Sequence, residues 1–375
     1  MKRFAGYLLA ASIVAAASVM TASGQPKAEK VRYMIDNVNR HWQSTVDAEH
    51  NALWSNAVYH IGNMEAYGLT GNETYRAYSE KWAEHNKWRS VGNDDKSVWK
   101  YRDSEYFSNL VLHADNQTCF QVFIDLYNLE PEDVKVERAK DVMGYQVSLP
   151  QDDFWYWCDA LFMAMPVMTR MYRLTGDDTY LYKLYDYVQY TDSVMYDKDE
   201  CMYYRDSRYV YPGHKSPDGK KDFWARGDGW VFAGLARVLQ ELPQDFEHYG
   251  FFADKFREMA AAVVKCQMKE GYWTRSLLDP EFASGPETSG TALIAYGLWW
   301  GINNGFLDRT CLPAAKKAWK YLSEVAYQEN GVVGYVQPVG DRAIEGQVLD
   351  ENSTANFGVG AFLLAACEYV RYLER

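Results

Sequence analysis

Features of metal-binding, nucleotide-binding and nucleic-acid-binding proteins are scarce in this sequence. Its six cysteines are widely separated and form no C-x-x-C pair, so we expect no metal site. No phosphate loop or dinucleotide fingerprint occurs, and we expect no cofactor. The net charge is −12 and no basic cluster stands out. Binding to nucleic acid requires surfaces rich in lysine and arginine, so we expect no nucleic-acid partner.

Residues 1–24 have the composition of a secretory signal peptide. Lys2 and Arg3 precede a short apolar run, and small residues follow it. The run is short for a transmembrane helix; a retained N-terminal anchor is the alternative. No cysteine precedes Cys119, so lipidation after the leader is not expected. We expect cleavage near Gly24, a periplasmic or secreted protein with no membrane association afterwards, and at most one or two disulfides.

The remainder, residues 25–375, is predicted to be one all-helical domain. Strand signals are almost absent, and helical periodicity recurs from end to end. The segment L-T-G-N-E-T-Y over residues 69–75 returns as L-T-G-D-D-T-Y over residues 174–180. In both copies a glycine ends one helix and Asn or Asp begins the next, so each copy is the turn of a helical hairpin. No linker or low-complexity stretch indicates a second domain.

Twelve helices are expected, and they form six hairpins if the first helix pairs with the last. Their expected ranges are 28–44, 51–68, 73–89, 115–128, 132–146, 158–174, 178–194, 228–242, 249–268, 288–304, 310–327 and 354–374. Six such hairpins close into a toroid, the (α/α)6 barrel, with an open superhelical stack as the alternative. The long connections over residues 90–114, 146–157, 195–227, 269–287 and 328–353 then gather at one mouth and shape a pocket.

Aromatic residues are abundant, with 13 Trp and 30 Tyr. Their rings stack on the flat faces of sugars, and the polar tips of Tyr and Trp form hydrogen bonds. A large aromatic core is the alternative, and composition alone does not separate the two interpretations.

The segment 223–230, F-W-A-R-G-D-G-W, is the strongest candidate for a binding site. Trp224 and Trp230 flank Arg226. A planar guanidinium binds a carboxylate through two parallel hydrogen bonds, and the flanking indoles hold the face of a sugar ring. Asp228 is expected to be the N-cap of the following helix.

Two acidic residues are candidates for catalysis. Asp159 lies near the start of a helix that is otherwise almost wholly apolar, and such surroundings raise the pKa of a carboxyl group, as a general acid requires. Asp115 opens the corresponding helix one hairpin earlier, so both carboxyl groups are expected to face one pocket. Paired carboxylates are the usual equipment of glycosidases. A helix N-cap is the alternative for each residue.

Other residues are weaker candidates. Arg205, His60 and Trp54 are possible contributors to a site. Glu287 is expected to cap a helix, and His214 is expected at the surface with no partner.

These segments resemble glycoside hydrolase families 88 and 105, the latter more closely, over most of residues 25–375. W-A-R-G-D-G-W over residues 224–230 is similar to the W-x-R-G-x-G-W segment of that family. Asp159 falls where the family carries its acid/base, and Asp115 falls where it carries a second active-site Asp. The chain departs from the pattern at Arg205, where some members have a His.

The resemblance implies an unusual reaction on an unsaturated acidic oligosaccharide. Such enzymes release a 4,5-unsaturated uronic acid from the non-reducing end by hydrating the C4=C5 bond, and they do not attack the anomeric carbon. The roles it implies are proton transfer for Asp159, positioning of water or ring hydroxyls for Asp115, ring stacking for Trp224 and Trp230, and carboxylate binding for Arg226 and Arg205.

Three other functions stay open. The first is an ordinary inverting glycosidase that acts on a saturated acidic oligosaccharide. The second is a sugar epimerase or polysaccharide lyase, enzymes that typically use His or Tyr bases, whereas the seven His of this chain include no convincing pair. The third is a catalytically dead carbohydrate-binding homologue. We expect a monomer or a weak homodimer.

Overall fold

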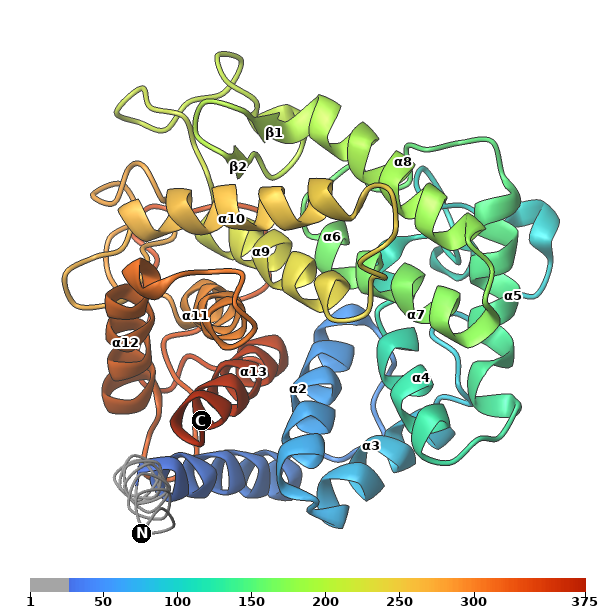
Figure 1. Cartoon of the computed structure of the whole chain (residues 1–375), viewed down its shortest axis with the longest axis horizontal. Helices are drawn as coiled ribbons and strands as arrows, with labels where there is room; N and C mark the ends of the chain where they lie inside the picture. The colour runs from blue at the N-terminus through green and yellow to red at the C-terminus, as the bar shows by residue number, and fades with distance from the viewer. Residues whose placement is uncertain (1–26) are drawn as a thin grey trace, which may run out of the picture.

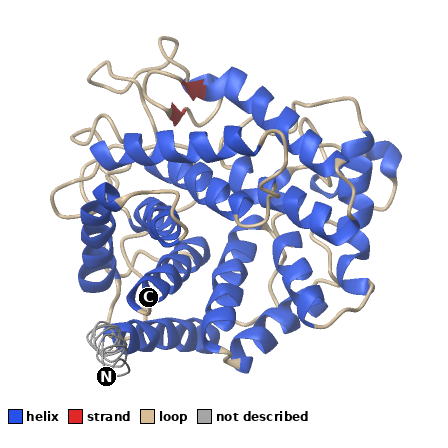
Figure 2. Cartoon of the chain, viewed as in Figure 1, coloured by secondary structure: helices blue, strands red, loops and turns tan. Residues whose placement is uncertain are grey.

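The computed structural model describes residues 27–375, so the predicted leader over residues 1–24 lies outside the described residues. Helices dominate this part of the chain (Figure 2). The helices with their bounds are one over residues 27–45, α2 (Trp54–Thr70), α3 (Glu73–His85), α4 (Phe120–Leu129), α5 (Val134–Ser148), α6 (Ala160–Met163), α7 (Met165–Thr175), α8 (Thr179–Met195), α9 (Ala225–Leu239), α10 (Tyr249–Lys265), α11 (Thr288–Asn303), α12 (Leu312–Tyr321) with a π-helical extension η6 (Leu322–Ala326), and α13 (Asn356–Leu373). Two short strands, β1 (Tyr196–Asp197) and β2 (Met202–Tyr203), form an antiparallel hairpin.

The helices form two concentric rings (Figure 1). The inner ring runs α2, α4, α6 with α7, α9, α11 and α13, and it closes where α13 packs against α2. Each inner helix is followed by an antiparallel outer helix, and the helix over residues 27–45 completes the sixth hairpin beside α13. An ion pair of 2.9 Å between Arg32 and Glu374 joins these two terminal helices. The predicted (α/α)6 barrel is therefore confirmed.

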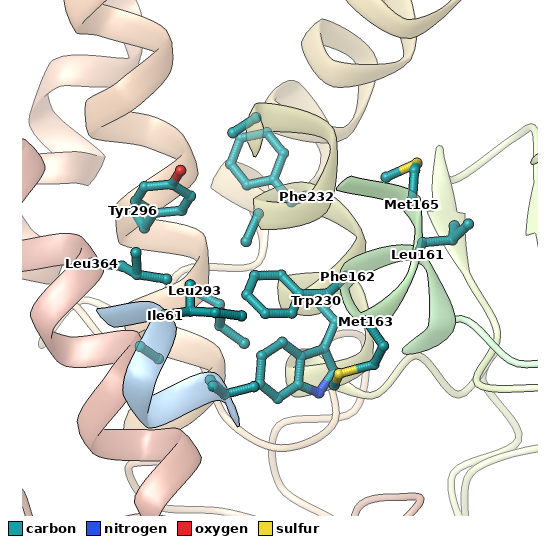
Figure 3. Packing of buried hydrophobic residues seen from close by; sticks show 14 of the residues in the cluster. Ile61, Leu161, Phe162, Met163, Met165, Trp230, Phe232, Leu293, Tyr296 and Leu364 are labelled. Atoms are coloured by element: carbon teal, nitrogen blue, oxygen red, sulfur yellow. The ribbon is translucent and has the colours of Figure 1, made fainter. Parts of the chain in front are cut away.

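Burial explains which helices lie inside. Every residue of α9 is buried, and so are all but one of α11, because apolar residues lie on all sides of α11 and dominate α9, so both helices are accommodated in the centre. Side chains from several inner helices converge in the barrel, among them Ile61, Phe162, Met163, Trp230, Leu293 and Leu364 (Figure 3). This packing leaves the ends of the barrel as the places for a site.

The predicted continuous helix over residues 158–174 is wrong, because the chain breaks it at Ala164 into α6 and α7. Pro166 has no N–H to donate to the carbonyl of Phe162 one turn earlier, and its ring disfavours a regular helix there. Gln121 of α4 replaces the lost donor, since its Nε2 donates to Phe162 O at 2.9 Å and to Met163 O at 3.2 Å. The break thus ties α6, and the residues directly before it, to α4.

Buried charges connect the inner helices at the end where those helices finish. Arg371 of α13 pairs with Glu65 of α2 at 2.5 Å, and Arg237 of α9 donates to Gln121 of α4 at 2.9 Å. Arg170 of α7 pairs with Asp125 at 2.7 Å and with Glu241 at 3.2 Å. These contacts join neighbouring inner helices, so the charged residues at this end have structural roles.

No helix within residues 27–375 combines the length and the apolar character needed to cross a bilayer. All six cysteines, which lie in this range, are free, so no disulfide supports the fold.

Substitution of Gly360 by Ala is expected to destabilise the barrel at its point of closure. A Cβ at Gly360 would lie 2.2 Å from the carbonyl oxygen of Val58, so α13 and α2 must separate. We expect a loss of about 2 kcal/mol or more in the free energy of unfolding, measured by urea denaturation. Gly68→Ala is the matched control on α2, because a Cβ there meets nothing within 4 Å. The control is expected to be neutral or to gain about 0.5–1 kcal/mol; equal effects of the two variants would contradict the close approach.

Candidate active site

A narrow pocket opens at the end of the barrel where the inner helices begin. Its volume is about 130 Å³. It is lined by Trp54, Asp115, Trp157, Asp159, Met163, Arg205, Trp224, Arg226, Trp230, Val339 and Gly340. The positive ends of the helix dipoles lie on this side, and they favour an anionic ligand. All six residues predicted for the site from the sequence are in this lining.

Asp159 lies immediately before α6 and makes no side-chain hydrogen bond to cap it. Its Oδ1 accepts a weak hydrogen bond from the thiol of Cys158 at 3.3 Å, and its Oδ2 lies 3.8 Å from Nη2 of Arg205. Burial raises the pKa of Asp159, and the charge of Arg205 opposes that shift. The carboxyl group therefore has an environment suited to proton transfer, and capping does not explain it.

Asp115 lies in a short 3-10 turn, η3 (Ala114–Asn116), ahead of α4. The predicted helix start at residue 115 is therefore wrong by five residues, since α4 begins at Phe120. Burial and the nearby charge of Asp159 raise the pKa of Asp115 to about 7. His113 lies 3.7 Å from Asp115, but burial lowers the pKa of this His to about 4. At neutral pH it is uncharged and does not offset the carboxylate.

Arg205 follows the β1–β2 hairpin and reaches the pocket from the side. Its carbonyl accepts the N–H of Cys158 at 2.9 Å, which fixes the loop beside Asp159. Its Nη1 donates to Asp206 at 2.8 Å. The side chain of Arg205 is 20% exposed. The loop therefore presents a partly accessible guanidinium next to the candidate acid.

Arg226, in the first turn of α9, is enclosed. Its Nη1 donates to Ser289 Oγ at 3.2 Å and to the carbonyl of Gln337 at 2.6 Å, and its Nη2 donates to the carbonyl of Pro338 at 2.8 Å. Only Nε has no acceptor among the described residues. The ring centroid of Trp224 lies 4.4 Å from the guanidinium carbon. Burial lowers the pKa of Arg226 to about 10, so it stays protonated at neutral pH.

These bonds hold residues 337–342, which we call the strap, across one side of the pocket. Besides Arg226, Trp224 donates through Nε1 to the side chain of Gln337 at 2.9 Å. Glu287 accepts the N–H of Gln337 at 3.0 Å. Val339 and Gly340 of the strap line the pocket, and the long connection to which they belong contains no sequence signal that singles them out.

The residues that form the aromatic walls of the pocket differ in part from those predicted. Trp230 is 1% exposed and forms the floor, with its ring edge-on to Trp54 at 6.3 Å. Trp54, only a weak candidate from the sequence, is more accessible at the entrance of the pocket. Trp157 was missed, although it lies two residues before Asp159 in an aromatic run that signals the pocket wall. Met163 was missed because it is indistinguishable from a core residue of α6.

Asp228 is not a helix cap, which corrects the prediction. The helix α9 starts three residues earlier, with Trp224 at the N-cap position. The Oδ1 of Asp228 accepts the N–H of Tyr203 at 2.8 Å, while Oδ2 is buried and has no partner among the described residues. Burial raises its pKa well above the usual range. Asp228 thus holds the β1–β2 hairpin that precedes Arg205.

The remaining candidates have structural positions. Glu287 caps α11 as predicted, since it accepts the N–H groups of Ser289 and Gly290. His214 was predicted to have no partner. This prediction is wrong, because its Nε2 lies 2.9 Å from Oδ2 of Asp222. His60 is buried against Trp82 and does not line the pocket. Within residues 27–375, no group of three or more His, Cys, Asp or Glu side chains is placed to hold a metal ion.

Comparisons with known proteins identify the class. The model of Glycosyl Hydrolase Family 88 matches residues 28–373, and the chain belongs to this family. A relative described as an unsaturated 3S-rhamnoglycuronyl hydrolase, from Formosa agariphila, is 34% identical over 336 residues, which are 86% of this chain and 85% of the relative. The chain is a hydrolase, and its family implies an oligosaccharide substrate. The resemblance to family 88 stated from the sequence is confirmed.

Two solved structures are also similar. One, of a family 88 glycosyl hydrolase from Bacteroides vulgatus, is 50% identical with a TM-score of 0.90, and the match covers 92% of this chain and 99% of that one. Another, described as a polysaccharide lyase, is 56% identical with a TM-score of 0.90, and the match covers 93% of this chain and 98% of that one.

Asp115 is expected to titrate near pH 7, about three units above an ordinary Asp. Carbon NMR of protein labelled at the aspartate carboxyl groups measures this directly. Asp159→Asn is expected to lower the pKa of Asp115, because it removes a negative charge that raises it. Asp141→Asn, on the outer helix α5, is the control and leaves that pKa unchanged. A pKa near 4 for Asp115 in the unmodified protein would contradict the raised pKa.

Proposed function

We propose that this chain releases a 4,5-unsaturated uronic acid from the non-reducing end of an oligosaccharide by hydrating the C4=C5 double bond. The observation that carries the proposal is the convergence of Asp115, Asp159 and Arg205 in one narrow aromatic pocket. Two carboxyl groups supply proton transfer, and a guanidinium matches the acid group of the sugar. The function named for the Formosa agariphila relative supports the same reaction.

Asp159 is the acid and base in this proposal. Its carboxyl group donates a proton to C4, which leaves positive charge shared by C5 and the ring oxygen. A water molecule then adds to C5 and returns a proton to the Asp159 carboxylate. The hemiketal so formed opens and releases the remaining sugar. Burial favours the protonated state that begins this cycle.

Asp115 and the indoles position the reactants. With a pKa of about 7, Asp115 carries a proton in much of the population at neutral pH and donates or accepts a hydrogen bond to the water or the ring hydroxyls. Trp230 supports the ring from the floor, while Trp224 and Trp54 form the walls. No step here uses a metal or a cofactor.

The size of the pocket favours attack at a chain end. At about 130 Å³ it is far smaller than the roughly 300–1,000 Å³ of typical ligand pockets. One sugar ring enters, and the following sugar lies at the rim formed by the strap. The described activity of the relative on unsaturated rhamnoglycuronyl compounds makes rhamnose our proposal for that second sugar.

The leader supports a proposal about location and assembly. We infer that the mature enzyme begins near residue 25, forms one catalytic domain and acts in the periplasm or outside the cell as a monomer or weak homodimer. Cell fractionation, N-terminal sequencing and sedimentation of the purified protein test these points.

One assay separates the candidate reactions. The conjugated C4=C5 bond absorbs ultraviolet light, so hydration of lyase-generated disaccharides destroys absorbance. A lyase acting on intact polysaccharide instead creates absorbance. The assay therefore also tests the activity in the description of the 56% identical structure, a polysaccharide lyase. New reducing ends from a saturated oligosaccharide without an absorbance change would indicate an inverting glycosidase, and binding without turnover a dead homologue.

Asp159→Asn is expected to lower kcat on the unsaturated disaccharide by on the order of 10²- to 10⁴-fold, because an amide neither donates nor accepts the proton. The decay of ultraviolet absorbance measures this loss. Asp178→Asn, at an exposed position before α8 with no capping bond, is the matched control and keeps full activity. Near-normal turnover by Asp159→Asn would rule out the assigned role.

A further inference from the structure

We propose that Arg205, more than Arg226, binds the carboxylate of the substrate, and that Asp206 positions Arg205 for this task. The inference rests on the proposed function, because it assumes an acidic sugar in the pocket.

The first argument is the availability of donors. Arg205 uses only Nη1, which donates to Asp206, and among residues 27–375 neither its Nε nor its Nη2 donates to an acceptor. These two groups form one edge of the guanidinium and match the two oxygens of a carboxylate. Arg226 already donates to three acceptors and is 1% exposed. Arg205 therefore keeps a donor edge that no hydrogen-bond acceptor among the described residues occupies, with Nε buried at one end of it and Nη2 at the other.

The second argument is proximity to the reacting bond. The carboxylate of an unsaturated uronic acid is attached to C5, next to the carbon that receives the proton. Its ligand must consequently lie within a few ångströms of the catalytic acid. The Nη2 of Arg205 lies 3.8 Å from Oδ2 of Asp159, whereas Arg226 forms no ion pair within 4.0 Å with that carboxyl group and acts on it less strongly than Arg205.

The third argument is preorganisation by Asp206. This carboxylate is 5% exposed and accepts Nη1 of Arg205 at 2.8 Å. It also accepts the N–H of Arg208 at 2.9 Å and its side chain at 2.8 and 2.9 Å. Asp206 thus fixes Nη1 of Arg205, while Nη2 has only the longer 3.8 Å pair with Asp159, so little conformational entropy is lost when the substrate carboxylate binds.

Binding in this place has a consequence for Asp159. In the empty pocket the positive charge of Arg205 favours the ionised form of Asp159. A substrate carboxylate offsets that positive charge with its own negative one, so Asp159 holds its proton more firmly once the substrate is bound. The other charged or titratable groups around Asp159 are Cys158, Arg226, Asp206 and Asp115. The positions and charges of these four groups stay the same when the substrate binds. The bound substrate itself thereby helps to keep Asp159 protonated and ready to donate its proton.

The experiment compares the unsaturated disaccharide with its uronate methyl ester, which lacks the charge. In the wild type, kcat/KM is expected to be on the order of 10- to 100-fold higher for the acid than for the ester. In Arg205→Ala that ratio is expected to fall close to one, because the group that senses the charge is gone. Arg205→Lys keeps the charge without the fork and is expected to retain an intermediate ratio. An unchanged acid-to-ester ratio in Arg205→Ala would overturn the proposal.

Two further variants separate positioning from stability. Asp206→Asn is expected to lower the acid-to-ester ratio several-fold, a readout that a merely structural defect does not move. Lys215→Ala is the matched control in the same long connection, since its side chain is exposed and is not in the pocket lining, and it is expected to retain the wild-type ratio. An unchanged ratio in Asp206→Asn would remove its positioning role.

Binding measurements keep this inference distinct from the proposed reaction. If the wild type turns over neither compound, the proposed function fails. Calorimetry with a saturated uronide and its ester then still tests Arg205. Loss of acid preference in Arg205→Ala supports the assignment, and preserved preference refutes it.

Discussion

The buried carboxylate of Glu287 organises the mouth of the barrel. It accepts the N–H groups of Ser289 and Gly290 at the start of α11 and the N–H of Gln337 in the strap. Arg226 donates to the next two carbonyls of that strap, and its charge lies in the field of Glu287. Removing either side chain would leave buried N–H or C=O groups of the strap without a partner, at a cost of about 1–3 kcal/mol for each group. The position of the strap, and with it one wall of the pocket, depends on this arrangement.

The two ends of the barrel use charge differently. At the far end Arg371 pairs with Glu65 and Arg170 with Asp125, and these pairs join the inner helices. At the pocket, by contrast, Arg205 keeps an unused edge. The helix dipoles point their positive ends to the same side. The fold thus satisfies its charges where it needs rigidity and leaves donors free where an anion is to bind.

Much of this architecture is readable from the sequence because it depends on local patterns. Glycine stops such as Gly71 and Gly176 and the apolar inner helices predict the hairpins and the ring. The segment around Trp224 and the acid Asp159 is recognisable because aromatic and charged residues alternate there. The helix break at Ala164 and the strap were missed for a different reason. Both depend on bonds between distant residues, such as the one that joins Arg226 to the carbonyl of Gln337, and no local pattern records them.

The strap also bears on how such enzymes diversify. It is fixed at its base by Gln337, and its outer part is fastened to the neighbouring loop by Asp341, which accepts from Arg208 and Tyr209 at 3.1 Å each. Between these two attachments Val339 is 67% exposed, and neither Val339 nor Gly340 belongs to the hydrophobic core of the helical rings. Exchanging that stretch between homologues is therefore expected to change the rim of the pocket and leave the helical rings intact. In this way the strap could adapt the enzyme to a different second sugar.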